Sequence, residues 1–258
     1  MNVPNQIAGD FLSLLNAHAI PPLSTKVTDA APLQTQATTV FAFQFADGVL
    51  MAGDRRATAG NMIVTDQVEK VIELDATSLL AIAGVPATAF EMARVLQSSF
   101  EYYRRSQLQS LSLPAKVRAL ARLLRDNLPM TMQGVGVVVP IFASVDQTTM
   151  PPQPRIFFYD PLGAQFLAVG YAATGSGSMS IRSVLSYQER YGSLKPSAMS
   201  LDEAVRFALR LLMTAAEFDS ATGGVNPAEH SFATIRVLTS TGIVTIGTDQ
   251  QRSALADA

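Results

Sequence analysis

Three residues near the start of this sequence have types and spacing that could support chemistry. Thr38, Asp54 and Lys70 follow one another at intervals of sixteen positions. If the chain is cut just before Thr38, that residue carries a hydroxyl nucleophile and a free α-amine on one framework. The amine can then act as the base for the hydroxyl, which is self-contained chemistry for acyl transfer.

The side chains that usually assist a nucleophile are scarce. The sequence has no cysteine, which excludes thiol catalysis, disulfides and thiolate metal sites. Its two histidines are His18, upstream of the candidate cut, and His230, which has no second ligand nearby at metal spacing. The stretch 175–178 completes neither the G-x-S-x-G elbow of serine hydrolases nor the G-x-G-x-x-G of nucleotide sites. We therefore expect neither metal nor cofactor.

Composition excludes several classes of protein. With 258 residues, 48% hydrophobic and 16% charged, the chain can bury a sizeable core as one large domain, or as one domain with an appendage. A net charge of −2 gives no basic footprint for nucleic acid or membranes. The apolar run 11–15 has no basic residue before it, and no run of about 18 apolar residues predicts a membrane span. We expect a cytoplasmic protein.

The first 37 residues differ in character from the rest of the chain. They contain Pro4, Pro21, Pro22 and Pro32 and close with the polar stretch 34–36, after which strand-like sequence begins abruptly. Proline at this density is typical of an irregular segment or linker. We therefore expect a boundary directly before Thr38.

Apolar runs predict the strands. Residues 39–45 and 49–52 flank a turn at Asp47-Gly48 and predict an antiparallel hairpin. Two further apolar runs, 71–74 and 79–83, are expected to continue the sheet of this hairpin. The remaining runs predict a second block of strands and a closing pair, at 135–145, 155–159, 165–170, 232–238 and 243–246.

Helical spacing of apolar residues predicts four helices. Two follow in succession over 90–103 and from near Pro114 to 128, and a third begins around Met179. The fourth has a capping box of Ser200 and Glu203 ahead of its apolar positions. The order of strands, two helices, strands, two helices and strands predicts stacked antiparallel sheets with helices on both outer faces.

Taken together, the motifs resemble the β subunit of the bacterial proteasome core particle. Each is common alone, but their order and spacing are specific, and the match runs from Thr38 to about residue 250. The motifs are Thr38-Thr39-Val40, Met51 to Thr58, Gly60-Asn61, Val68 to Val71, Ile82-Ala83-Gly84, Gly175 to Ser178 and Asp219 to Gly224.

The resemblance implies an α+β fold, the four-layer α-β-β-α sandwich of N-terminal nucleophile hydrolases. Residues 1–37 would be a propeptide removed autocatalytically, and residues 38–258 the hydrolase domain. The implied function is a threonine endopeptidase that degrades unfolded proteins to peptides inside a closed chamber. Its partners would be identical subunits in heptameric rings, rings of α subunits, and an ATP-dependent unfoldase acting through the α ring.

The resemblance also assigns roles at the reacting centre. Thr38 would be the nucleophile, freed by cleavage between Ala37 and Thr38. Lys70 would keep the α-amine of Thr38 neutral, and Asp54 would hold Lys70 charged and oriented. The α-amine has a reference pKa of roughly 7.7–8.0, which suits a base at neutral pH.

Further residues match the family's supporting positions. Asp219 and Ser176 would orient the amine and water, and Thr222 occupies a place where relatives carry serine or threonine. The N–H of Gly84 would donate to the tetrahedral oxyanion. An uncharged substrate pocket would be formed, with Thr58 as a further contact, by Ala57, Val68, Ile72, Ile82, Pro86 and Phe90.

One position departs from the family pattern. Relatives typically carry glycine directly before the threonine, whereas this chain has Ala37, whose Cβ restricts the backbone at the bond to be cut. Two alternatives stay open beside the protease, and the first of them follows from Ala37. One is a catalytically silent, unprocessed ring subunit with a role in assembly; the other is a simpler compartmental protease or acylase working without α subunits.

Overall fold

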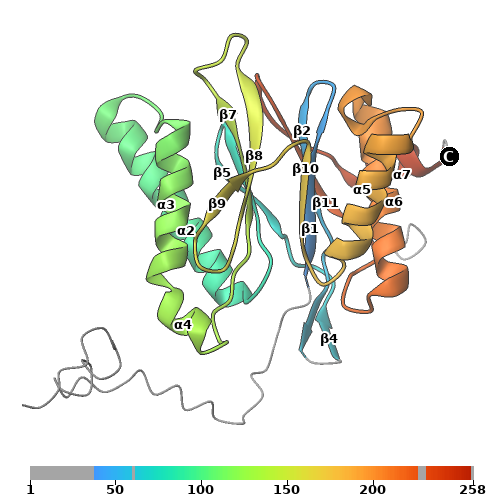
Figure 1. Ribbon diagram of the computed structural model, residues 1–258, viewed down its shortest axis with the longest axis horizontal. Coiled ribbons are helices and arrows are strands. Elements are labelled where there is room, and N and C mark those ends of the chain that lie inside the picture. Colours follow the sequence, from blue (N-terminus) through green and yellow to red (C-terminus); the bar gives the residue numbers. More distant parts are fainter. Residues whose placement is uncertain (1–37, 60–61, 226–230, 257–258) are drawn as a thin grey trace, which may run out of the picture. The chain divides into compact units, whose positions relative to one another are not determined.

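The computed structural model describes residues 38–59, 62–225 and 231–256. Within these residues, two five-stranded antiparallel sheets pack face to face, with helices on their outer faces (Figure 1). The first sheet has the order β10-β1-β2-β11-β12, with bounds Tyr171–Gly175, Thr39–Phe45, Gly48–Gly53, Thr234–Thr239 and Gly242–Thr245. The second has the order β5-β6-β7-β8-β9, with bounds Val71–Asp75, Ser78–Ala81, Ile141–Asp146, Gln153–Tyr159 and Gln165–Leu167. This α+β sandwich is the fold class that the sequence predicted.

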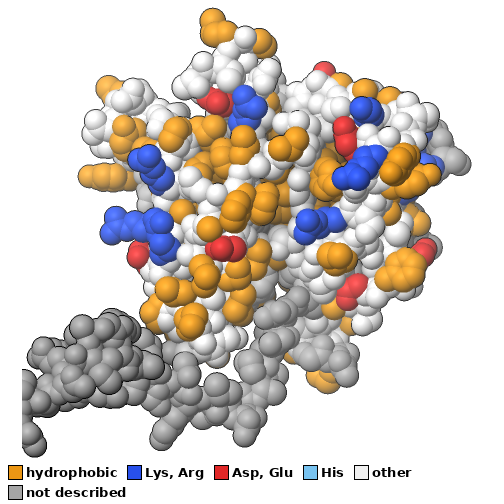
Figure 2. Space-filling model, in the orientation of Figure 1, with side chains coloured by type: hydrophobic (Ala, Val, Ile, Leu, Met, Phe, Trp, Pro, Cys, Tyr) orange, Lys and Arg blue, Asp and Glu red, His pale blue; other side chains and the backbone are white. Residues whose placement is uncertain are grey.

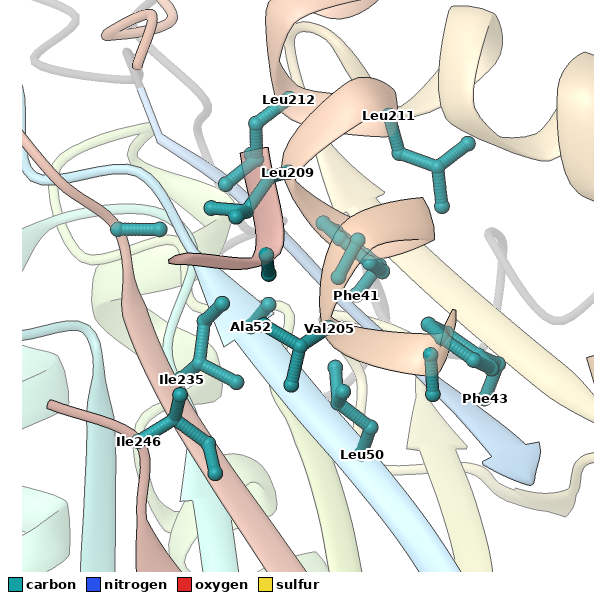
Figure 3. Packing of buried hydrophobic residues seen from close by; sticks show 14 of the residues in the cluster. Phe41, Phe43, Leu50, Ala52, Val205, Leu209, Leu211, Leu212, Ile235 and Ile246 are labelled. Carbon is teal, nitrogen blue, oxygen red and sulfur yellow. The ribbon is translucent and has the colours of Figure 1, made fainter. Parts of the chain in front are cut away.

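Strands β1 and β2 are buried on both faces because they lie between two cores. Side chains alternate across a strand, so Val40, Ala42 and Val49 contribute to the core between the sheets. Phe41 and Phe43, with opposite parity, contribute to the core beneath the helices. Figure 3 shows them beside Leu50 and Ala52 of β2, with Val205, Leu209 and Leu212 of one helix packed among them. The continuous apolar run of the sequence is therefore that of a central strand.

Helices cover each sheet. Figure 1 shows one group beside the first sheet, α5 (Ser178–Tyr191), α6 (Leu201–Phe218) and α7 (Thr248–Ala256), and the other beside the second sheet, α2 (Pro86–Gln107), α3 (Leu113–Asp126) and α4 (Leu128–Met132). A short 3₁₀ helix, Pro196–Ala198, precedes α6. The capping box of Ser200 and Glu203 is confirmed, since Glu203 Oε2 accepts from the Ser200 N–H at 2.8 Å and Ser200 Oγ accepts from the Glu203 N–H at 3.5 Å.

Several sequence-based expectations about connectivity were wrong. Runs 71–74 and 79–83 do not continue the sheet of β1 and β2 but form β5 and β6 of the other sheet. The reason is that β10 and β11, distant in sequence, occupy the two edges of the β1–β2 hairpin. The predicted strand 135–145 begins only at Ile141, and 165–170 ends at Leu167, after which the chain crosses to the first sheet as the unpredicted β10.

Smaller elements were also missed. The hairpin of β3 (Ala57–Ala59) and β4 (Met62–Thr65), together with α4 and α7, had no prediction. The turn between β1 and β2 lies one residue earlier than expected, at Ala46-Asp47. The leader, residues 1–37, lies outside the described residues, as does His230. Within the part of the chain that is described, no helix has both the length and the apolar character needed to cross a bilayer.

A buried ion pair joins α3 to the second sheet. Lys116 is 2% exposed, and its Nζ lies 2.7 Å from Asp75 Oδ2. The same Nζ donates to Thr77 Oγ1 at 3.0 Å and Ser78 Oγ at 2.9 Å. Burial by itself raises the pKa of Asp75, but the hydrogen bond and charge of Lys116, together with hydrogen bonds from Thr77 and Ser78, outweigh this effect, so the pKa of Asp75 lies below its ordinary value. The charged form of the Asp75 carboxylate is therefore stabilised by Lys116.

We expect Lys116→Met to destabilise the fold by about 2–4 kcal/mol, because it leaves a largely buried carboxylate without its cation. Since the folded pKa of Asp75 is lowered, the pair stabilises the wild type at neutral pH, and this contribution is lost as pH falls through that pKa. The difference in thermal midpoint between wild type and variant should therefore be largest near neutrality and shrink in acid. Arg94→Met is the matched control, because Arg94 pairs with Glu91 only on the surface, at 3.9 Å. Equal midpoints for both variants would contradict the prediction.

Candidate active site

Thr38 lies directly before β1, and the strand β10 holds it from the side. Only 6% of Thr38 is exposed. Its carbonyl oxygen accepts from the Ser176 N–H at 3.1 Å. Gly175 makes this approach possible: its φ is +98°, and a Cβ there would lie 1.6 Å from the Thr38 oxygen. Gly175, the first glycine of the 175–178 motif, therefore allows the backbone to approach the candidate nucleophile closely.

Asp54 and Lys70 form a buried ion pair beside Thr38. Asp54 directly follows β2 and is 1% exposed, and Lys70 directly precedes β5 and is 2% exposed. Lys70 Nζ donates to Asp54 Oδ1 at 2.7 Å and to the Arg56 carbonyl at 2.5 Å. The carboxylate also accepts from the backbone N–H groups of Thr39 at 2.8 Å, Arg56 at 2.9 Å and Gly223 at 2.9 Å. Its lone pairs are thus used by groups from four different segments.

Burial determines the acidity of Lys70. Desolvation lowers its pKa, and the charge and hydrogen bond of Asp54 oppose this effect without cancelling it. The pKa of Lys70 therefore lies below its ordinary value of 10.5. Asp54 makes the largest contribution that opposes this lowering of the Lys70 pKa.

A second carboxylate with its hydrogen-bond partners lies at the end of α6; we call this group and that of Asp54 the two carboxylate clusters. Asp219 directly follows this helix, and its Oδ2 accepts from Ser176 Oγ at 2.6 Å and from Thr222 Oγ1 at 2.5 Å. Asp219 Oδ1 accepts from the Ala221 N–H at 3.1 Å, which fixes the turn that carries Thr222. The structure thus brings together the three residues that the resemblance had assigned to supporting positions.

A small pocket, mainly apolar, opens beside Thr38. It contains five predicted site residues besides Thr38 and Lys70, and Ala89 in addition; its lining is Thr38, Ala57, Val68, Lys70, Ile82, Gly84, Pro86 and Ala89. Sequence reasoning missed Ala89, although it lies three residues after Pro86 on the same face of α2 and could have been found from helical spacing.

Gly84 adopts a left-handed backbone conformation at a crowded position of the pocket. Its φ is +115°, and a Cβ there would lie 2.1 Å from the Val137 carbonyl oxygen. No residue with a side chain fits this position without moving the backbone. The backbone of Gly84 therefore lies at the pocket in a fixed orientation, held against residues 137 and 138.

Three residues predicted to contact substrate lie elsewhere. Ile72 and Phe90 are partly buried against the core between the second sheet and helices α2 and α3. Thr58 is buried in β3, paired in register with Ile63, and does not belong to the lining of the pocket. Ala37 lies outside the described residues. Among those that are described, no three histidine, cysteine or carboxylate side chains gather as a metal site.

Sequence reasoning also missed the residue that joins the two carboxylate clusters. The Thr39 N–H donates to Asp54, and Thr39 Oγ1 lies 2.5 Å from Thr222 Oγ1 and accepts from the Gly177 N–H at 3.0 Å. Its partner hydroxyl is 183 positions away. The only sequence signal was its place as second residue of the Thr38-Thr39 pair.

Comparison with known proteins finds consistent similarity. A family model described as "Proteasome subunit" matches residues 34–227. The chain is 37% identical over 253 residues to a proteasome subunit beta of Streptomyces griseus, covering 96% of this chain and 85% of the relative. Proteins of the same name from Acidimicrobium ferrooxidans and Frankia casuarinae are 38% and 37% identical, over 89% and 90% of this chain and 81% and 82% of the relatives.

Proposed function

Since the chain belongs to the proteasome family and is a β-type subunit of its core, a class of protein-cleaving hydrolase, we propose that Thr38 is its nucleophile. The observation that carries this proposal is the position of Thr38 at the pocket that Lys70 also lines, with Asp54 buried behind the lysine. A buried, hydrogen-bonded cation next to a candidate amine base has a catalytic use that a surface ion pair lacks.

The proposed reaction begins once the bond before Thr38 has been cut. Thr38 Oγ attacks the scissile carbonyl while its own α-amine takes the hydroxyl proton, giving a tetrahedral intermediate. The peptide C–N bond then breaks, the protonated α-amine passes its proton to the leaving amine, and an acyl-enzyme ester remains. Water, activated by the same α-amine, hydrolyses this ester and regenerates the Thr38 hydroxyl. Lys70 favours the neutral amine by its charge. The N–H of Gly84 stabilises the oxyanion, a contribution of about 2.7–4 kcal/mol for a comparable donor elsewhere.

The pocket favours an uncharged substrate side chain before the cut bond. Its walls include Ala57, Val68, Ile82 and Ala89, and burying an unpaired charge against them is costly. The positive charge of Lys70 is already used by Asp54. We therefore expect apolar side chains at this position to be preferred over acidic or basic ones.

The subunit is expected to work inside a larger assembly. The family implies a core built with α subunits, and we extend this to heptameric rings of identical β subunits, an unfoldase and a cytoplasmic location. Exposed apolar side chains support association: Figure 2 shows them gathered over the face where β9 lies, and Phe158, Phe166 and Leu167 are 39%, 45% and 56% exposed.

The test is to produce the chain with its α partner and measure intact mass, N-terminal residue and hydrolysis of apolar-ended peptide amides. We expect particles whose β chain begins at Thr38 and cleaves these peptides. An intact leader with normal hydrolysis would contradict the amine as base. An intact leader without hydrolysis would favour the silent ring subunit, and activity without any α partner would favour the simpler compartmental enzyme.

We further expect Ala37→Gly to speed leader removal about 2- to 5-fold, because the Cβ of alanine restricts the peptide that Thr38 must attack. The finished enzyme should have unchanged kcat, since residue 37 has left. Ala30→Gly is the matched control and should mature at the wild-type rate. Mass spectrometry over time after mixing with α subunits measures both. Equal maturation of all three proteins would show that the junction residue does not limit cleavage.

A further inference from the structure

Thr39 combines complete burial with polar contacts to both carboxylate clusters. It is 0% exposed. On β1 it shares the helix-facing side with Phe41 and Phe43, because side chains alternate along a strand. It does not line the pocket that contains Thr38. Any influence of Thr39 on substrate must therefore pass through other residues.

The direction of its hydrogen bonds can be derived by counting protons. Thr222 Oγ1 has one proton, and it donates that proton to the Asp219 carboxylate at 2.5 Å. In the bond between Thr39 and Thr222, Thr39 Oγ1 must then be the donor. Thr39 Oγ1 itself accepts from the Gly177 N–H. The result is one directed chain from Gly177 through Thr39 and Thr222 to Asp219, in which each bond polarises the next.

The chain of hydrogen bonds ends on the same Asp219 oxygen that accepts from Ser176. Asp219 Oδ2 accepts from both Thr222 Oγ1 and Ser176 Oγ. Ser176 and Gly177 are adjacent, and the Ser176 N–H donates to the Thr38 carbonyl. The segment carrying Ser176 is therefore fixed at its Oγ, at its own N–H and, through Thr39, at the N–H of the next residue.

The groups that form these hydrogen bonds are closely packed, so they have little room to move. A Cβ at Gly177 would lie 2.6 Å from Thr222 Oγ1 and 2.8 Å from Thr39 Oγ1. Both hydroxyls thus pack directly against the backbone of the loop. Loss of the Thr39 hydroxyl would leave the Gly177 N–H buried without its acceptor and allow the loop to shift.

We propose that Thr39 is a positioning residue for catalysis, whose hydroxyl holds the Ser176–Gly177 segment and Asp219 in register with Thr38. This inference rests on the proposed function, in which Thr38 is the nucleophile. The backbone N–H of Thr39 also donates to Asp54, so this one residue aligns the groups on both sides of the nucleophile. Only the hydroxyl contribution can be removed by substitution.

The experiment compares Thr39→Val, which keeps the shape and removes the hydroxyl, with Thr39→Ser, which keeps the hydroxyl. In processed particles we expect Thr39→Val to lower kcat about 10- to 100-fold with KM within about 2-fold, since alignment and not substrate binding is lost. Thr39→Ser should recover most of the rate. Ser144→Ala removes a buried hydroxyl pair in the other sheet and should change stability but not kcat.

A double-mutant cycle tests whether Thr39 acts through the chain. Thr222→Val breaks the chain at its next link, so the double variant should be no slower than the slower single variant, within about 2-fold. If the fold-losses in kcat of the two single variants multiply in the double variant, Thr39 and Thr222 act independently and the proposal is overturned. Wild-type kcat in Thr39→Val would also overturn it.

The remaining outcomes separate this inference from the proposed function. If Thr39→Val does not assemble, the smaller Thr39→Ala replaces it; failure of both beside an assembled Thr39→Ser would show a purely structural role and overturn the proposal. Wild-type and Thr38→Ala particles are measured in parallel. An inactive wild type, or an active Thr38→Ala, would refute the proposed nucleophile itself, whereas an active wild type with inactive Thr38→Ala and unaffected Thr39→Val would refute only the role of Thr39.

Discussion

Replacing Thr38 with alanine is expected to abolish peptide hydrolysis, with kcat falling on the order of 10⁴-fold or more, as when a nucleophile is removed from other hydrolases. The physical reason is that the attacking oxygen is lost while the pocket, the ion pair and the fold remain. The variant should also retain residues 1–37, because the same hydroxyl is proposed to cut the bond before it. Initial rates with an apolar-ended peptide amide and intact mass measure both effects.

Thr38→Ser is the matched comparison, since it keeps a hydroxyl and an α-amine on the same framework. It should mature and retain measurable turnover. The thermal midpoint of the alanine variant should stay close to that of the wild type, because only a small side chain beside a pocket has been shortened. Turnover at the wild-type rate in Thr38→Ala would refute the assignment of the nucleophile.

The second large effect is expected for Lys70→Met, which should lower kcat by about 10³-fold or more and stop maturation, comparable to the loss of a catalytic base or its activator. Without the ammonium, the proposed amine base gains affinity for a proton, so its pKa rises. Residual activity should therefore require a higher pH than wild-type activity does. Because an uncut variant has no free amine, a pH series of kcat/KM measures this shift on particles whose β chain is produced beginning at Thr38.

The chain contains its own control for this experiment. Lys116 is as buried as Lys70 and lies at the same 2.7 Å from an aspartate, but it belongs to the α3 junction and not to the pocket. Lys116→Met should therefore cost stability while kcat stays within about 2-fold of wild type. If Lys70→Met behaves in the same way, Lys70 is a structural residue.

Loss of the fold must be separated from loss of chemistry in Lys70→Met, because Asp54 is left buried without its cation. The double variant Lys70→Met/Asp54→Asn removes both charges and should regain much of the thermal stability. It should remain inactive, since no ammonium faces the amine. Recovery of turnover in the double variant would contradict the role given to Lys70.

The order and type of the main elements could be predicted where the cause is local. The helix capped by Ser200 is specified by a capping box of residues three positions apart, and α3 has the predicted Pro114 in its first turn. The β1–β2 hairpin results from a short turn between two apolar runs. Such signals depend on neighbours within a few residues, so they are present in the chain before it folds.

Sheet membership could not be predicted in this way. Residues 71–74 and 79–83 have the apolar character of any central strand, and nothing within them states which sheet they join. The free edges of the first hairpin pair with β10 and β11, more than a hundred residues later. That choice depends on which complete arrangement buries both faces of β1 and β2, which is a property of the assembled fold.

At the candidate site, the sequence by itself determined the chemical inventory: a threonine after a proline-rich leader, an acid and a lysine at regular spacing, and neither cysteine nor a metal-binding pattern. The tertiary structure alone decided how these groups are used. It buries Asp54 against Lys70, places Ala89 in the pocket and Phe90 against the core, and joins Thr39 to Thr222 across 183 positions. The physical reason is that residue type fixes which bonds a side chain can make, whereas burial and partner are fixed only when distant strands and helices pack together.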